Sequence, residues 1–258
     1  MNEGLRLHLA LCTVAERLAA VMEGARFERR DGYAFVTFPA LPIPSFNGVW
    51  PDEDSAATAL PDALAEIEAN GIAPGVVIRN EETPAVAETA RELGLTAVEH
   101  MPGMVANAGD LVGPAAPELE IVHVKSADEF AQALAIATEG FGAPEGFLTP
   151  LYMPEVTSLD GYELFLGRVD GRDVTTAASY VVDDDLGVFN VATPSQFRGR
   201  GYGAAITAHA VHEGFAKGAG LAYLQSSALG ESVYRRLGFR EVVRYDLLSR
   251  PAEVSPTS

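Results

Sequence analysis

The chain has 258 residues, 48% of them hydrophobic and 21% charged, and it contains five histidines and one cysteine. This length suffices for one large domain or two small ones. The formal net charge of −18 argues against nucleic acid and anionic membranes as partners and is compatible with a cationic acceptor. Cys12 cannot form an internal disulfide, which favours the cytoplasm, and the histidine spacing indicates no metal site.

The first half of the chain alternates helix and strand patterns. Asp31 and Gly32 are a strong hairpin signal between two strands, and Pro84 is placed as the first residue of a helix. Helices are expected over residues 4–22, 61–69 and 84–94, and strands over 26–30, 33–39, 43–50, 75–79 and 95–105. The Gly-, Pro- and Ala-rich segment 109–117 is predicted to be a linker.

The second half shows a similar alternation. Ser126 and Glu129 have the spacing of a capping box at the start of a helix that runs to about residue 139. Residues 140–159 include three prolines and cannot form one long helix. Strands are expected over 119–124, 162–169, 174–182, 186–193, 221–226 and 239–248, and helices over 202–217 and 231–237.

The two halves contain matching strings of residues. Phe46–Pro51 (FNGVWP) matches Phe189–Pro194 (FNVATP) at a shift of 189 − 46 = 143. Arg91–Leu95 (RELGL) matches Arg235–Phe239 (RRLGF) at a shift of 235 − 91 = 144. Two matches at nearly one offset, within the same order of elements, indicate a duplication. Generic strand-turn and helix-stop patterns are the alternative explanation.

A glycine-rich loop in the second half carries the strongest functional signal. The apolar strand that ends near Thr193 leads into QFRGRGYG, residues 196–203, and a helix starts there at once. Alternate glycines let successive amides point into one concavity, and the helix N-terminus adds unpaired N–H groups. Arg198 and Arg200 add positive charge, so the loop is predicted to hold a diphosphate. A dinucleotide-binding fingerprint is excluded because the loop follows an antiparallel meander.

A second candidate follows the strand that ends near Ser226. A polar loop leads into a short helix that presents Tyr234 one turn before Gly238 and Phe239. A tyrosine in this position, taken by itself, is explained by packing more readily than by catalysis.

These two motifs resemble those of the GNAT N-acetyltransferase superfamily. Gln196, Gly199 and Gly201 match its pyrophosphate motif, and Tyr234 with Gly238 and Phe239 matches its later motif. The order of elements from residue 119 to 248 also resembles the family fold. The resemblance implies an α/β (α+β) fold of two GNAT-like halves, each a mixed, mostly antiparallel sheet flanked by helices. Residues 1–112 would form a degenerate domain without a CoA site, and residues 118–258 the catalytic domain.

The resemblance also implies the site and its chemistry. An amine would attack the thioester of acetyl-CoA or another acyl-CoA, a cosubstrate, through an oxyanion held by backbone N–H groups, and no metal is needed. Tyr234 would protonate the CoA thiolate as general acid. The residues implied to contact CoA lie in the strand, the loop and the second motif: Val191, Ala192, Thr193, Gln196, Arg198, Gly199, Arg200, Gly201, Tyr202, Gly203, Ala204 and Ser227.

Two departures from the family pattern weaken the second motif. Ser227 stands where asparagine is common, and Gly230 where alanine is usual. No general base stands out among the candidates, which are Asp183–Asp185, Glu145 and Glu155.

The first half has lost the equivalent machinery. Asp52–Asp54 replaces the glycine loop with three acidic residues, which would repel a diphosphate. Ala90 aligns with Tyr234, because 234 − 144 = 90. This half is expected to pack against the active half, shape the acceptor cleft or mediate dimerisation.

The sequence therefore predicts an acyl-CoA-dependent N-acyltransferase that acts on a small-molecule or peptide amine. The alternative is a CoA-binding regulatory or scaffolding protein with little turnover. No nucleic acid or membrane partner is expected, the cytoplasm is the expected location, and homo-oligomerisation is left open.

Overall fold

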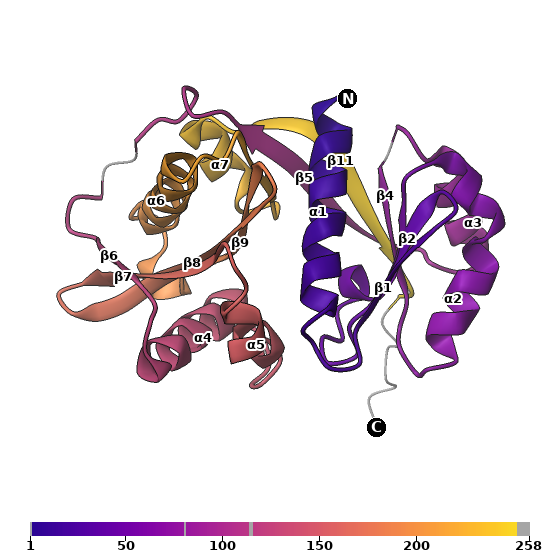
Figure 1. Cartoon of the computed structure of the whole chain (residues 1–258), viewed down its shortest axis with the longest axis horizontal. Helices are drawn as coiled ribbons and strands as arrows, with labels where there is room; N and C mark the ends of the chain where they lie inside the picture. Colours follow the sequence, from indigo (N-terminus) through magenta and orange to yellow (C-terminus); the bar gives the residue numbers. More distant parts are fainter. Residues whose placement is uncertain (1, 80, 114–115, 252–258) are drawn as a thin grey trace. The chain divides into compact units, whose positions relative to one another are not determined.

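The computed structural model describes residues 2–79, 81–113 and 116–251. It has a mixed α/β fold with mostly antiparallel strands, as expected (Figure 1). The chain divides into two compact units. The N-terminal unit comprises Ala15–Met101 and the segment from Val243 onward, and the C-terminal unit comprises the segment up to Val14 and Pro102–Val242. None of the helices among the described residues is both long and apolar enough to cross a membrane.

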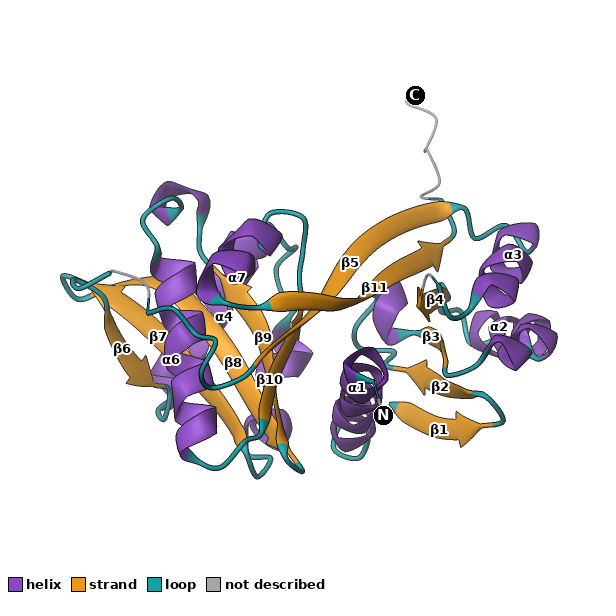
Figure 2. Ribbon diagram, turned by 90° about the horizontal axis from the view of Figure 1, so that it is seen from above, coloured by secondary structure: helices purple, strands orange, loops and turns teal. Residues whose placement is uncertain are grey.

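The N-terminal unit is built on the strands β1 (Arg26–Arg30), β2 (Tyr33–Thr37), β3 (Gly48–Pro51) and β4 (Gly75–Arg79). They lie side by side in this order, with β1–β2 and β2–β3 antiparallel and β3–β4 parallel (Figure 2). The helices α2 (Leu60–Glu68) and α3 (Pro84–Glu92) cover the sheet. Phe35, Ile67 and Val76 belong to the apolar cluster that joins them.

The C-terminal unit repeats this strand pattern. Its strands are β6 (Glu120–His123), β7 (Tyr162–Val169), β8 (Arg172–Val182), β9 (Asp185–Ala192) and β10 (Leu221–Gln225). The neighbours are antiparallel up to β9, and β9 is parallel to β10. The helix α4 (Ala127–Phe141) covers one face and α6 (Tyr202–Ala216) the other (Figure 1). The short helices α5 (Pro154–Thr157) and α7 (Glu231–Leu237) complete the unit.

Each unit receives one strand from the opposite half of the sequence. In β5 (Ala97–Ala106), residues 103–106 pair antiparallel with β10. In β11 (Arg240–Ser249), residues 245–249 pair antiparallel with β4. The compact units therefore differ from the expected division at residues 112–118, because hydrophobic alternation identifies a strand but not the edge with which it pairs.

The structure gives the second sequence match a physical meaning. The amide of Leu95 donates to the carbonyl of Ala90, and the amide of Phe239 donates to the carbonyl of Tyr234, both at 3.0 Å. Each helix ends at a glycine with positive φ, +88° at Gly94 and +103° at Gly238. Ala90 thus occupies the position in α3 that Tyr234 occupies in α7.

The first match does not extend to conformation. Asn47 has a φ of −135°, whereas Asn190 has a φ of +51°. Asn47 is buried, and its side chain accepts the Phe38 amide and donates to the carbonyls of Leu41 and Ile43. Residues 44–46 form a 3-10 turn, so β3 begins at Gly48 and not near residue 43 as expected.

Most other elements lie within a few residues of their predicted positions. The first helix, α1 (Glu3–Ala19), ends three residues earlier than expected. The capping box of α4 is confirmed: the Glu129 amide donates to Ser126 Oγ at 3.3 Å, and the Ser126 amide donates to Glu129 Oε2 at 3.1 Å. Residues 140–159 contain a 3-10 turn, Thr149–Tyr152, and the short α5, in agreement with their prolines.

Candidate functional site

Strands β9 and β10 pair in parallel only over their first residues. The register runs from Leu221 opposite Asp185 to Tyr223 opposite Gly187. At Gly187 a Cβ atom would lie 2.3 Å from the Phe189 ring and 2.9 Å from the Tyr223 ring. The Phe189 ring therefore lies over Gly187, next to the last registered pair of the two strands. This geometry leaves the end of β9 outside the registered pairing with β10.

A β-bulge redirects β9 just beyond this point. Ala178 lies opposite Phe189 and Thr176 opposite Ala192, so Asn190 and Val191 together face one residue of β8. Asn190 has a φ of +51°, in the left-handed region that asparagine tolerates better than most side chains. The asparagine of the FNVATP string is the one sequence signal for this bulge, and hydrophobic alternation alone does not predict it.

The end of β9 is fixed by side-chain hydrogen bonds to its carbonyl groups. Thr175 Oγ1 donates to the carbonyl of Ala192 at 2.9 Å and lies 2.9 Å from Thr193 Oγ1. Arg198 donates through Nε to the carbonyl of Thr193 at 2.9 Å and through a terminal nitrogen to the carbonyl of Gly140 at 2.6 Å. The Arg198 guanidinium thus ties the glycine loop to β9 and to α4. The sequence suggested a cation facing the diphosphate, and the structure places this side chain on two backbone carbonyls.

The glycine loop has the conformation that its sequence requires. Gly199 and Gly201 have φ values of +76° and +84°, which strain other residues. Gly201 immediately precedes α6, and the Ala205 amide donates to its carbonyl at 2.9 Å. The preceding amides at the helix start, from Tyr202 to Ala204, have no intrahelical acceptor. The Arg198 amide already donates to Ser195 at 3.3 Å, so the candidate anion-binding amides are those of residues 199–204.

Gln196 and Tyr202 support the loop through their side chains. Gln196 Nε2 donates to Glu139 Oε1 in α4 at 2.7 Å. The Tyr202 side chain is buried in an apolar cluster with Val174 and Phe197. Both side chains thus anchor the loop to the rest of the C-terminal unit, and the Tyr202 amide lies at the start of α6.

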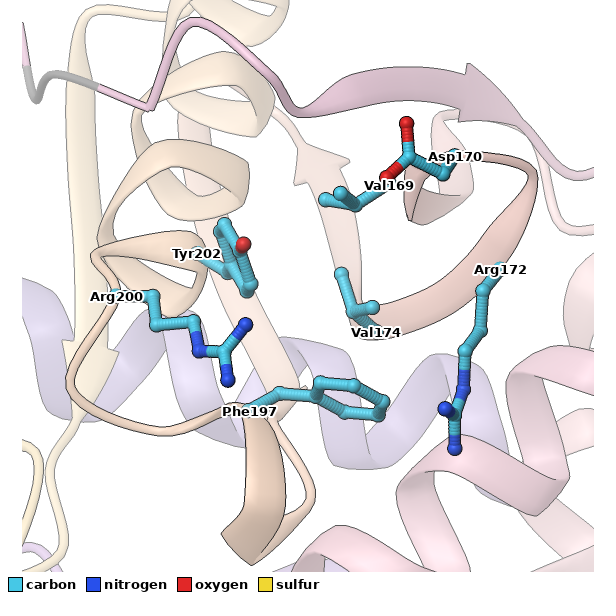
Figure 3. A pocket seen from close by; sticks show the side chains of 7 residues that line it. All are labelled: Val169, Asp170, Arg172, Val174, Phe197, Arg200 and Tyr202. Carbon is cyan, nitrogen blue, oxygen red and sulfur yellow. The ribbon is translucent and has the colours of Figure 1, made fainter.

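A small hollow of about 280 Å³ lies beside the loop. Figure 3 shows the Phe197 ring between the side chains of Arg200 and Arg172, with Tyr202 and Val174 further along the wall. The Arg172 guanidinium lies 4.8 Å from the Phe197 ring centroid. Arg200 is exposed, lines this hollow and forms no salt bridge with another described residue. It is the arginine of the loop whose charge remains available to a ligand.

Tyr234 lies on α7 and packs against the apolar cluster that contains the start of α6. Its ring is 6.0 Å from that of Phe239, and Val191 and Ala204 border the same cluster. Burial raises the pKa of Tyr234 to about 12, and its hydroxyl lies beside that of Thr207 in α6. Thr207 donates to the carbonyl of Gly203 at 2.8 Å. The structure therefore brings Tyr234 close to the first turns of α6.

The two family departures lie next to this tyrosine. The exposed Ser227 accepts the Gly230 amide through Oγ at 3.3 Å, and so helps to shape the turn before α7. A Cβ atom on Gly230 would lie 2.8 Å from the Tyr234 ring. An alanine at this position would therefore require the Tyr234 ring to shift.

The acidic residues of the N-terminal unit make structural contacts at the equivalent place. Asp54 Oδ1 accepts the amides of Ala85 and Val86 at 2.7 and 3.1 Å, which caps α3. Asp52 forms an ion pair with Arg29 at 2.6 Å. Among the base candidates, Asp185 is held by Arg6 at 2.6 Å, while Glu145 and Glu155 are exposed. The geometry singles out no general base.

Comparisons with solved structures show which fold the chain shares. A GCN5-related N-acetyltransferase from Kribbella flavida superimposes with a TM-score of 0.77 at 24% identity, over 98% of this chain and 97% of that chain. A second one, from Sphaerobacter thermophilus, gives a TM-score of 0.64 at 15% identity, over 97% and 95% of the two chains.

The chain has the GNAT fold. A conserved protein of unknown function from Staphylococcus epidermidis shares it, with a TM-score of 0.67 at 14% identity over 90% of this chain and 96% of that one. No protein-family model matches the sequence, and no curated protein matches it significantly. The agreement over nearly the whole length extends the likeness beyond the C-terminal motifs to both halves.

Proposed function

We propose that the protein is an acyl-CoA-dependent N-acyltransferase whose active site lies in the C-terminal unit. The observation that carries the proposal is the path of β9. This strand leaves its registered pairing with β10, bulges at Asn190 and ends in a glycine loop with unpaired amides at the start of α6. Such a path offers one edge for an extended arm and one concavity for a diphosphate.

The contacts in the loop support a role for each of several groups. The amides of residues 199–204 hold the diphosphate, with Arg200 as the nearby cation. The carbonyls of Ala192 and Thr193 already accept Thr175 and Arg198, so the amide and carbonyl of Val191 are the main-chain groups assigned to the pantetheine arm. The exposed Ser227 hydroxyl is assigned to the same arm from the opposite side.

The chemistry is direct attack on the thioester. The acceptor amine forms the new C–N bond, the C–S bond breaks, and the amine proton passes to solvent. The Tyr234 hydroxyl donates a hydrogen bond to the departing CoA thiolate. The acceptor is the amine of a small molecule or peptide, and the net charge of −18 favours a cationic one.

The decisive experiment replaces Gly201 by glutamate. Gly201→Glu adds strain at a φ of +84°, fills the concavity and places a negative charge among the amides, so acetyl-CoA binding should be lost in isothermal titration calorimetry. Gly218→Glu is the matched control, because Gly218 follows the other end of α6 with a φ of +101° and open space around it. The control should bind acetyl-CoA normally.

Equal binding by the two variants would place the diphosphate elsewhere and refute the proposed site. Turnover is measured separately, as thiol release from acetyl-CoA with a panel of amines. Binding by the loop without turnover on any amine would support instead a regulatory or scaffolding protein that has kept the fold.

A further inference from the structure

Three potential metal ligands meet on the C-terminal unit, away from the glycine loop. His123 is the last residue of β6, and His209 and Glu213 lie one turn apart on one face of α6. One ligand atom from each of the three lies within 4.8 Å of the others. His209 is seven residues beyond Tyr202, which corresponds to about 10 Å along the helix from its start beside the glycine loop.

The two imidazoles are held in place by one buried aromatic ring. His123 lies opposite Phe165 in the β6–β7 pair, with ring centroids 4.8 Å apart. His209 packs edge-on against Phe165 at 5.3 Å, and the two imidazole centroids are 6.3 Å apart. Phe165 is fully buried. The rings are thus oriented by packing before any ligand arrives.

The distances leave room for an ion. His123 Nε2 lies 3.9 Å from Glu213 Oε2, which is too long for a hydrogen bond. Zinc lies about 2.0–2.2 Å from imidazole nitrogen and carboxylate oxygen, so it fits between two such atoms up to about 4.2 Å apart. A small rotation of either side chain would reach the separation of about 3.3 Å found in a tetrahedral site.

The third residue has an unsatisfied polar atom. His209 Nε2 is buried and has no hydrogen-bond partner within the described part of the chain. A buried polar atom of this kind calls for an explanation, and coordination of a metal ion is one of the few that fit. His123 and Glu213 keep about a third of their side-chain surface exposed, 36% and 37%, so an ion can enter from solvent and retain water.

We propose that His123, His209 and Glu213 bind a divalent transition-metal ion, tested here as Zn²⁺. Two imidazoles and one carboxylate suit zinc, and three protein ligands leave a position for water. The ion would tie the edge strand β6 to α6 and so stabilise the C-terminal unit. The glycine loop precedes the N-terminal end of the same helix. This assignment goes beyond the proposed transferase activity and does not depend on it.

The test is isothermal titration calorimetry of the untagged full chain with ZnCl₂. The wild type should bind one equivalent, and His209→Ala and Glu213→Gln should each weaken binding by about tenfold or more. Glu213→Gln conserves size and so separates ligand loss from unfolding, and circular dichroism verifies the fold of each variant. His212→Ala is the matched control, because this exposed histidine of α6 lies outside the cluster, and it should bind as the wild type does.

Cobalt provides an independent signature. Co²⁺ bound by the wild type should show the visible absorption of a low-coordinate site, and the two ligand variants should lose it. The proposal is overturned if the wild type shows no saturable Zn²⁺ binding, if the ligand variants bind as the wild type does, or if His212→Ala weakens binding as much as they do.

Discussion

Replacing Tyr234 by phenylalanine tests the chemistry of the proposed site most directly. The change removes one hydroxyl and keeps the ring that packs against Phe239 and Gly230. Because the hydroxyl lies near Thr207 and not in the glycine loop, Tyr234→Phe should leave acetyl-CoA affinity and thermal stability nearly unchanged. Turnover should fall.

The pKa of Tyr234 indicates whether its hydroxyl transfers a proton or only donates a hydrogen bond, and this determines the expected fall in kcat. Burial raises this pKa to about 12, whereas an ordinary thiol has a pKa of about 8.5. Full proton transfer from the tyrosine to a thiolate would therefore be uphill by about 3.5 pKa units, or about 5 kcal/mol. A hydrogen bond to the developing thiolate is the favourable role instead, and such a bond to a charged group contributes about 1.5–3 kcal/mol. We expect kcat to fall by about 10- to 150-fold.

The pH dependence provides a second readout. A tyrosine with an ordinary pKa of about 10 would ionise and lose its donor near that pH. Tyr234, with its pKa raised to about 12, stays protonated through pH 10, so its ionisation should produce no alkaline loss of kcat below about pH 11.

The assay is steady-state thiol release at saturating acetyl-CoA with a reactive amine, for the wild type and the variant from pH 7 to 10. Wild-type kcat in Tyr234→Phe would remove the hydroxyl from the mechanism. An alkaline loss near pH 10 that disappears in the variant would show that Tyr234 has an ordinary pKa, contrary to its burial. A fall caused only by weaker acetyl-CoA binding would assign the residue a structural role.

Three further predictions concern Gly230, the two arginines of the glycine loop and the number of CoA sites. Gly230→Ala should lower kcat with little change in acetyl-CoA affinity, because its Cβ would lie 2.8 Å from the Tyr234 ring and displace it; unchanged kcat would mean that the ring tolerates the shift. Arg198→Ala should destabilise the protein by about 1–3 kcal/mol in thermal unfolding, since two carbonyls lose a charged donor. Arg200→Ala should keep the stability and weaken acetyl-CoA binding in a salt-dependent way, and the reverse pattern would exchange the two roles. Calorimetric titration of the full chain should give one CoA per chain, because Asp52 pairs with Arg29 and Asp54 caps the start of α3. A stoichiometry of two would show a working site in the N-terminal unit.

The glycine loop could be predicted from sequence because its constraints are local. Gly199 and Gly201 adopt positive φ, as alternate glycines before a helix suggest, and the helix begins at Tyr202 as expected. The stop of α7 at Gly238 is a further case, since a left-handed glycine that ends a helix needs only its neighbours.

The partners of the loop side chains could not be predicted, because they come from distant residues. Arg198 and Gln196 bond Gly140 and Glu139, more than 50 positions earlier in the chain. A pattern of charges along the sequence contains no information on which carbonyl a guanidinium reaches. The position of β11 beside β4 escaped prediction for the same reason, since any strand of suitable pattern can complete an open edge.

The exchange of β5 and β11 affects how the chain folds during synthesis. The edge of β4 is complete only when residues 245–249 pair with it, and these residues leave the ribosome after the entire C-terminal unit has been made. Until then, the N-terminal unit has an open strand edge that other chains can pair with. Cutting the gene between its two halves would leave each product without a strand that the other encodes, so neither product could complete its sheet alone.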